Sequence, residues 1–170
     1  MRLAIAAHVR NGASLLLLPK REQSLYPFFP HWQAVKVNER RNTLWAGDWA
    51  SSFAWMRRSG QFRRLPSGPL LDETFDRVIP EHVISGCNLL DFQARVFAGL
   101  VVGWIHKPVA LGVERSYGRG RMVASTLRLF RDAPGADPTA TILIDSLTEL
   151  ATESRASRIE EALRAAEAAA

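Results

Sequence analysis

The stretch from Val96 to Thr126 constrains the fold more than any other part of the chain, because β-rich runs follow one another there with short links. The runs cover residues 96–104, 109–115 and 121–126. Between the last two, Tyr117-Gly118-Arg119-Gly120 supplies two glycines, and glycine adopts the positive φ that tight turns require. The pattern predicts a β-hairpin and a chain that builds a sheet.

The N-terminal residues predict half of an α/β unit. Residues 3–10 indicate a short helix that stops at Asn11-Gly12, a pair suited to a left-handed helix end. Residues 13–18 form an unbroken apolar run closed by Pro19, which is typical of a strand buried on both faces of a parallel sheet. Because so little chain precedes this strand, we expect the chain to start inside the α/β fold, with little room for a preceding strand. One sheet edge or face would then expose apolar surface.

Residues 20–80 form an aromatic, proline-rich insertion. Within it we expect a short strand at 34–37, a helix at 48–56 capped by Asp48, and a helical turn at 72–78. The helix at 48–56 would place Trp49, Phe53 and Met56 on one face.

The C-terminal part predicts two helical segments. Asp137-Pro138 has the cap and first-turn residues of a helix, whose buried stripe comprises Ala140, Leu143, Ile144, Leu147 and Ala151. Residues 153–170 are alanine-rich and indicate a helical or frayed tail. Residues 1–152 then form the folded domain.

Composition indicates an ordinary globular domain. The chain has 170 residues, 47% of them apolar, and 22 Lys+Arg against 17 Asp+Glu give a formal charge of +5. A single cysteine excludes an internal disulfide framework and a multi-cysteine zinc site. No signal peptide or membrane-spanning run occurs, so we expect a cytoplasmic protein. The arginines are scattered, which makes nucleic acid an unlikely partner.

Few residues predict catalysis. The four histidines have no metal-ligand spacing, and Cys87 has no helix pattern after it, which favours a buried, inert thiol. The acidic groups Asp72-Glu73 with Asp76, and Asp132 with Asp137, could supply the paired carboxylates of a glycosidase. Helix caps and solvated charges explain them better. We therefore predict no catalytic residue, no metal and no cofactor.

Aromatic and arginine side chains are mixed around residues 49–64 and could bind sugar or single-stranded nucleic acid by stacking. Arginines at the edge of an aromatic core explain the same pattern. The candidate carbohydrate contacts are Trp49, Trp55, Trp104, Arg57 and Arg58.

Segments of the second half resemble the C-terminal end of bacterial family 2 glycoside hydrolases, the β-galactosidase and β-glucuronidase-like enzymes. The resemblance is carried by residues 99–108, 117–121, 127–132 and 134–138, and more weakly by 49–55 and 65–72. It covers roughly residues 3–151.

The resemblance implies a partial flavodoxin-like, class I glutamine amidotransferase-like domain, an α/β fold with a three-layer sheet, a late hairpin and a C-terminal helix. In that family the two catalytic glutamates belong to a barrel that this chain lacks. The resemblance therefore implies a non-catalytic accessory or scaffold domain whose partner is the glycosidase barrel or a second subunit. The alternative is a small carbohydrate- or anion-binding module that uses exposed aromatics and arginine pairs.

Overall fold

The computed structural model describes residues 2–25, 34–41, 43–46, 52–58, 60–66, 68–103, 107–133 and 135–153. Trp49 and Trp104, the first half of the helix expected at 48–56 and the tail after residue 153 lie outside the described residues.

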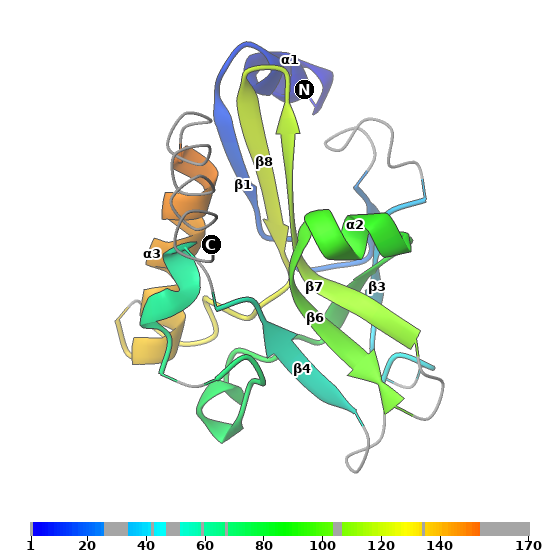
Figure 1. The fold of residues 1–170 in the computed structure, drawn as a ribbon, viewed down its shortest axis with the longest axis vertical. Coiled ribbons are helices and arrows are strands. Elements are labelled where there is room, and N and C mark those ends of the chain that lie inside the picture. The colour runs from blue at the N-terminus through cyan, green and yellow to red at the C-terminus, as the bar shows by residue number, and fades with distance from the viewer. Residues whose placement is uncertain are drawn as a thin grey trace, which may run out of the picture.

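The described strands join in one strongly curled mixed sheet that forms a half-barrel (Figure 1). The sheet runs in the order β1-β8-β7-β5-β3-β2, while β6 pairs with β7 and β4 with β6. The strands are β1 (Ser14–Leu17), β2 (Gln23–Ser24), β3 (Lys36–Glu39), β4 (Phe53–Met56), β5 (His82–Ser85), β6 (Val96–Val102), β7 (Lys107–Tyr117) and β8 (Gly120–Ser125).

The prediction of a flavodoxin-like, three-layer parallel sheet is wrong. Among the described strands only β1 and β8 pair in parallel, and the other ladders are antiparallel. Parallel neighbours need crossover connections of a dozen or more residues, whereas β6, β7 and β8 follow one another through short links. The short links therefore dictate antiparallel pairing.

Strand β7 organises the sheet because it pairs with three others. Ala110 pairs with Gly99 of β6 and with Ile84 of β5, while Gly112 pairs with Ala98 of β6 and with Ser125 of β8. Strands β5 and β8 therefore share the edge of β7 that faces away from β6. After Thr126, whose backbone N–H still reaches Leu111, strand β8 leaves β7 and β5 takes its place. The sheet forks at this point.

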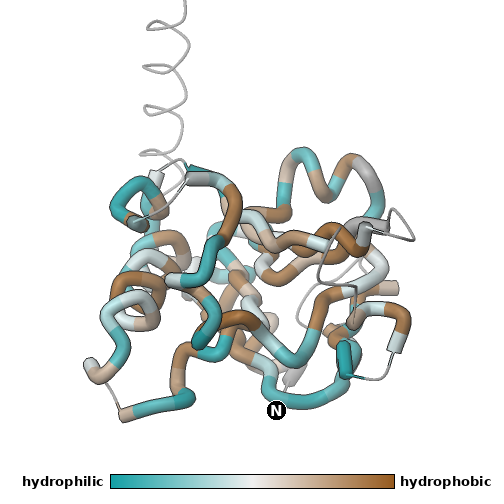
Figure 2. Tube along the Cα trace, turned by 90° about the horizontal axis from the view of Figure 1, so that it is seen from below, coloured by the Kyte–Doolittle hydropathy of each residue, from teal (hydrophilic) through white to brown (hydrophobic). Residues whose placement is uncertain are grey.

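Two hydrophobic cores flank the curled sheet, and separate helices pack over them without forming continuous helical layers (Figure 1). α3 (Pro138–Thr152) and the short helices η1 (Gly60–Arg64) and η2 (Glu73–Phe75) pack over one core, which centres on Phe62, Phe75, Leu143 and Leu147. α1 (Arg2–Arg10) and α2 (Leu89–Ala94) contribute Val9 and Phe92 to a second core. Figure 2 shows the hydrophobic segments running through the interior and hydrophilic segments in the outer loops.

Several local predictions are confirmed. α1 ends at Asn11-Gly12, β7 and β8 form the expected hairpin, and the Asp137 side chain caps α3 by accepting from Thr139 and Ala140. The apolar run after α1 forms β1, which is the parallel partner of β8. Its leucines pack toward both cores but stay half-buried, because β1 ends the sheet.

Two local predictions are wrong. Phe53–Met56 is strand β4 instead of a helix, so Phe53 is exposed while Met56 is buried on the opposite face. Cys87 is followed by a helix after all, because Asn88 and Asp91 form a reciprocal capping box that starts α2.

Candidate functional site

A cavity of about 320 Å³ lies at the fork of the sheet. Three segments line it: residues 18–20 after β1, residues 81–82 at the start of β5, and residues 126–131 after β8. Because β1 and β8 run in parallel, their carboxyl ends meet at the same edge, which is where open sheets that contain parallel strands commonly hold ligands. We call this cavity the fork pocket.

Cationic groups outnumber anionic groups in the fork pocket. Lys20, Arg128 and Arg131 line it against a single carboxylate, Glu81. The Arg128 guanidinium makes one ion pair, Nη1 to Glu81 Oε1 at 3.3 Å, and its Nη2 donates to the Asp76 carbonyl at 3.5 Å. Its Nε is buried and has no hydrogen-bond partner in the described part of the chain. The pocket therefore presents positive charge that its own carboxylate does not balance.

An aromatic ring stands beside this charge. The Lys20 ammonium lies 5.9 Å from the centroid of the Phe130 ring, within the range of a cation–π contact. Phe130 is 50% exposed, whereas Leu127 and Leu129 in the same segment are buried. An apolar surface and a cation are thus available together to a molecule in the pocket.

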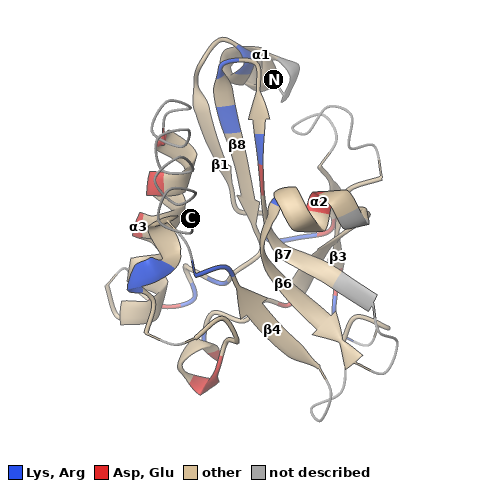
Figure 3. Ribbon diagram, viewed as in Figure 1, with Lys and Arg blue, Asp and Glu red and all other residues tan. Residues whose placement is uncertain are grey.

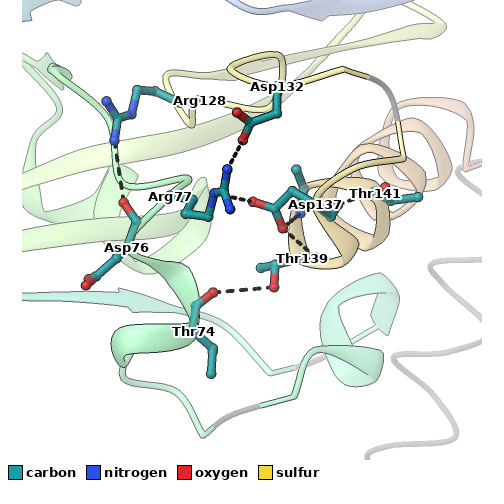
Figure 4. Close-up of polar contacts among 9 residues, drawn as sticks. Thr74, Asp76, Arg77, Arg128, Asp132, Asp137, Thr139 and Thr141 are labelled. Atoms are coloured by element: carbon teal, nitrogen blue, oxygen red, sulfur yellow. Dashed lines mark hydrogen bonds and ion pairs between the residues drawn. The ribbon is translucent and has the colours of Figure 1, made fainter.

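Ion pairs and hydrogen bonds outside the pocket hold its walls (Figure 4). Arg77 follows η2 and contacts Asp132 at 2.7 Å and Asp137 at 4.0 Å, which ties the end of the 126–132 segment to the start of α3. The Thr139 hydroxyl donates a hydrogen bond to the Thr74 carbonyl at 3.4 Å. These contacts link the segment that carries Arg128 and Phe130 to η2 and α3.

Hydrogen bonds from Arg40 support the β5 side of the pocket. Arg40 donates from Nη1 to the Pro80 carbonyl at 3.0 Å and from Nε to the Trp45 carbonyl at 3.2 Å. Burial lowers the pKa of this guanidinium, but arginine stays charged at any physiological pH. The Arg40 backbone N–H also donates to the Glu81 carbonyl, so the carboxylate that faces Arg128 sits on a fixed backbone.

The described candidate carbohydrate contacts, Trp55, Arg57 and Arg58, do not line the fork pocket. Trp55 lies against Gly99, where a Cβ atom would come within 2.7 Å of the indole ring. Arg57 donates to the carbonyls of Phe92 and Gln93, and Arg58 donates to the carbonyl of Leu65. The two arginines thus support backbone, as arginines at the edge of a core do.

The remaining candidate groups are accounted for structurally. Burial and the nearby Asp91 raise the pKa of Cys87 to about 12, so the thiol stays protonated at neutral pH. Hydrogen bonds from Thr74 lower the pKa of Asp72, which caps η2. Asp132 and Asp137 share Arg77. No cluster of metal-ligand side chains occurs in the described ranges, and His31 and His106 lie outside them.

Lys and Arg, and likewise Asp and Glu, occur on several of the described elements (Figure 3). None of the described helices is long and apolar enough to cross a membrane.

Compared with known proteins, the chain matches no family model, no curated protein and no solved structure. The resemblance to family 2 glycoside hydrolases therefore stays a prediction. Sequence reasoning missed the fork pocket, although one signal was present: Leu127-Arg128-Leu129-Phe130-Arg131 places two arginines and an aromatic directly after a strand.

Proposed function

We propose that the chain is a binding module for a small anionic molecule, and that the fork pocket is its site. One observation carries the proposal: three cationic side chains and one carboxylate line a cavity large enough for a small ligand. A carboxylate or phosphate group there would pair with Arg128, Arg131 and Lys20. Charge-assisted hydrogen bonds of this kind are the strong ones in proteins.

The state of Arg128 supports the proposal further. A buried polar atom without a hydrogen bond costs about 1–3 kcal/mol, and the Arg128 Nε is such an atom. Nε itself is covered, so a ligand in the pocket would reach the exposed part of the side chain, whose charge pairs with Glu81 alone among the described residues. The side chain is still 30% exposed, so it remains accessible from the pocket.

The proposal is tested by calorimetric titration with inorganic phosphate and with glucose 6-phosphate. We expect saturable binding that weakens with added sodium chloride, because the contacts are ionic. Arg128→Gln should weaken binding about tenfold or more, since it removes a charge-assisted contact. Arg63→Gln is the matched control, because Arg63 is an exposed arginine of η1 outside the pocket. The proposal is refuted if the wild-type chain binds neither probe at tens of millimolar.

A second candidate function is the accessory domain implied by the glycoside hydrolase resemblance, in which the chain packs against a catalytic barrel or a second subunit. An exposed apolar surface at β4 favours it. Phe53 and Leu70 are 46% and 56% exposed. Leu70 pairs with Trp55 in an isolated antiparallel β-bridge, and Trp55 lies on the same face of β4 as Phe53. Sedimentation velocity tests whether this surface packs against a second copy of the chain. In that case Phe53→Asp should abolish self-association and leave anion binding unchanged.

A further inference from the structure

The fork pocket has an apolar part and a cationic part, and their placement restricts the chemistry of its ligand. Phe130 and the half-buried Leu18 supply the apolar surface, and Lys20, Arg128 and Arg131 supply the charge. A ligand class inferred from this placement rests on the function proposed above.

The apolar part is available to a ligand mainly through the Phe130 ring. Leu127 and Leu129 are only 4% and 5% exposed, whereas Phe130 is 50% exposed. Large exposed aromatics on a pocket wall are typical of sites that bind rings, because offset stacking and area burial both favour the contact. The Lys20 ammonium lies over one face of this ring, 5.9 Å from its centroid, so a cation is close to any ring that contacts Phe130.

The polar part has few groups that can accept a hydrogen bond from a hydroxyl group, because Lys20, Arg128 and Arg131 are donors only. The Thr126 side chain is buried, and its hydroxyl already donates to the Leu111 carbonyl at 3.3 Å. Glu81 and His82 are the other uncharged or anionic polar side chains on the described wall. A sugar needs several such partners to replace its lost water contacts. The wall therefore favours a ring with few polar substituents.

The volume of the cavity and the charges on its wall restrict the ligand further. A cavity of about 320 Å³ is at the small end of the range of ligand pockets, which suits one ring and disfavours an extended chain. The Glu81 carboxylate beside Arg128 repels a second anionic group, so the pocket favours a ligand with a single anionic substituent.

We propose that the ligand class of the fork pocket is a single-ring aromatic acid, with its carboxylate or phosphate at Arg128, Arg131 and Lys20 and its ring against Phe130. A carboxylate and a phosphate monoester share this chemistry, and the probes below distinguish them.

The experiment is a set of calorimetric titrations of the full chain with phenyl phosphate, benzoate, inorganic phosphate, glucose 6-phosphate and benzyl alcohol. We expect phenyl phosphate to bind about tenfold more tightly than inorganic phosphate, because only the former buries a ring. Benzyl alcohol should bind more weakly than either aromatic acid. Benzoate tighter than phenyl phosphate would identify the carboxylate as the preferred anion.

Phe130→Ala should remove the advantage of phenyl phosphate over inorganic phosphate and leave the affinity for inorganic phosphate within about twofold. Phe53→Ala, at another exposed phenylalanine, is the control and should change neither affinity. Circular dichroism checks that both variants are folded.

The outcomes separate the aromatic ligand class from the anion site. Equal affinities for phenyl phosphate and inorganic phosphate would overturn the aromatic ligand class and leave the anion site intact. Tighter binding of glucose 6-phosphate than of phenyl phosphate would also overturn it. Binding of none of the anionic probes would refute the anion site itself.

Discussion

Arg121 is the most deeply buried charged side chain among the described residues, with 3% of its surface exposed. It lies on β8 and pairs with Glu114 of β7 at 3.3 Å and with Glu153 at 3.1 Å. It also donates to the Leu150 carbonyl in the last turn of α3, where a cation is favoured by the helix dipole. One residue thus joins two strands and the end of a helix.

Replacing Arg121 by methionine should lower the free energy of unfolding by about 3 kcal/mol, because the two glutamates lose their cation while they stay largely covered. Chemical denaturation measures the change, and Arg63→Met on the surface should change it by less than about 0.5 kcal/mol. A variant as stable as the wild type would mean that the buried cation contributes nothing net.

Cys87 gives a second test on a single residue. Its pKa is raised from 9.0 to about 12, so at pH 8 the folded thiol has about 1000-fold less thiolate than an unfolded one. Alkylation by iodoacetamide should accordingly be slow in the native chain and fast in denaturant. A native rate at pH 8 equal to the denatured rate would contradict the burial of the thiol.

Among the elements, the turn between β7 and β8 packs against the end of α1. Arg119 donates from its backbone to the Arg10 carbonyl at 3.0 Å and from its side chain to the Asn11 carbonyl at 3.0 Å. Gly118 has a φ of +60°, and a Cβ at Gly120 would come within 2.1 Å of the Ala13 carbonyl oxygen. Helix and hairpin therefore meet backbone to backbone, which only glycine permits.

Gly120→Ala should destabilise the chain by about 1–3 kcal/mol, because the clashing atoms are backbone carbonyls that cannot rotate away. Gly68→Ala is the control, since no atom lies within 4 Å of the place that a Cβ would take there, and the change should be near neutral. Thermal unfolding of the two variants gives the comparison. Equal melting temperatures would show that the helix and the turn do not meet closely.

The elements that sequence could predict are those with strong local signals. The glycine turn, the Asn11-Gly12 stop and the Asp137 cap each satisfy backbone groups within a few residues, so α1, the β7–β8 hairpin and α3 were predictable. β4 was not, because Phe53, Trp55 and Met56 fit either a helical stripe or an alternating strand, and pairing with the distant β6 decides between them. α2 has only six residues, too few to show a helical period, so the Asn88–Asp91 capping box is its one local signal.

In the molecule as a whole, the long strand β7 creates the candidate site. Its edge is shared by β8 and β5, and the pocket opens where one replaces the other. Lys20, Glu81 and Arg128 come together there from segments more than forty residues apart in sequence. No local sequence pattern predicts that these three segments lie together, because their proximity depends on the parallel pairing of β1 with β8 and on the fork of the sheet. The pocket therefore became visible only with the fold.

The sharpest test of the proposed anion site is a titration of the ¹⁵N-labelled chain with inorganic phosphate, followed by two-dimensional NMR. If the fork pocket is an anion site, saturable shift changes should concentrate at the amides of Leu18, Lys20, residues 81–82 and residues 126–131, and Arg128→Gln should remove them. Shifts spread evenly over the surface arginines, or a spectrum unchanged by phosphate, would contradict the assignment of the fork pocket as the binding site.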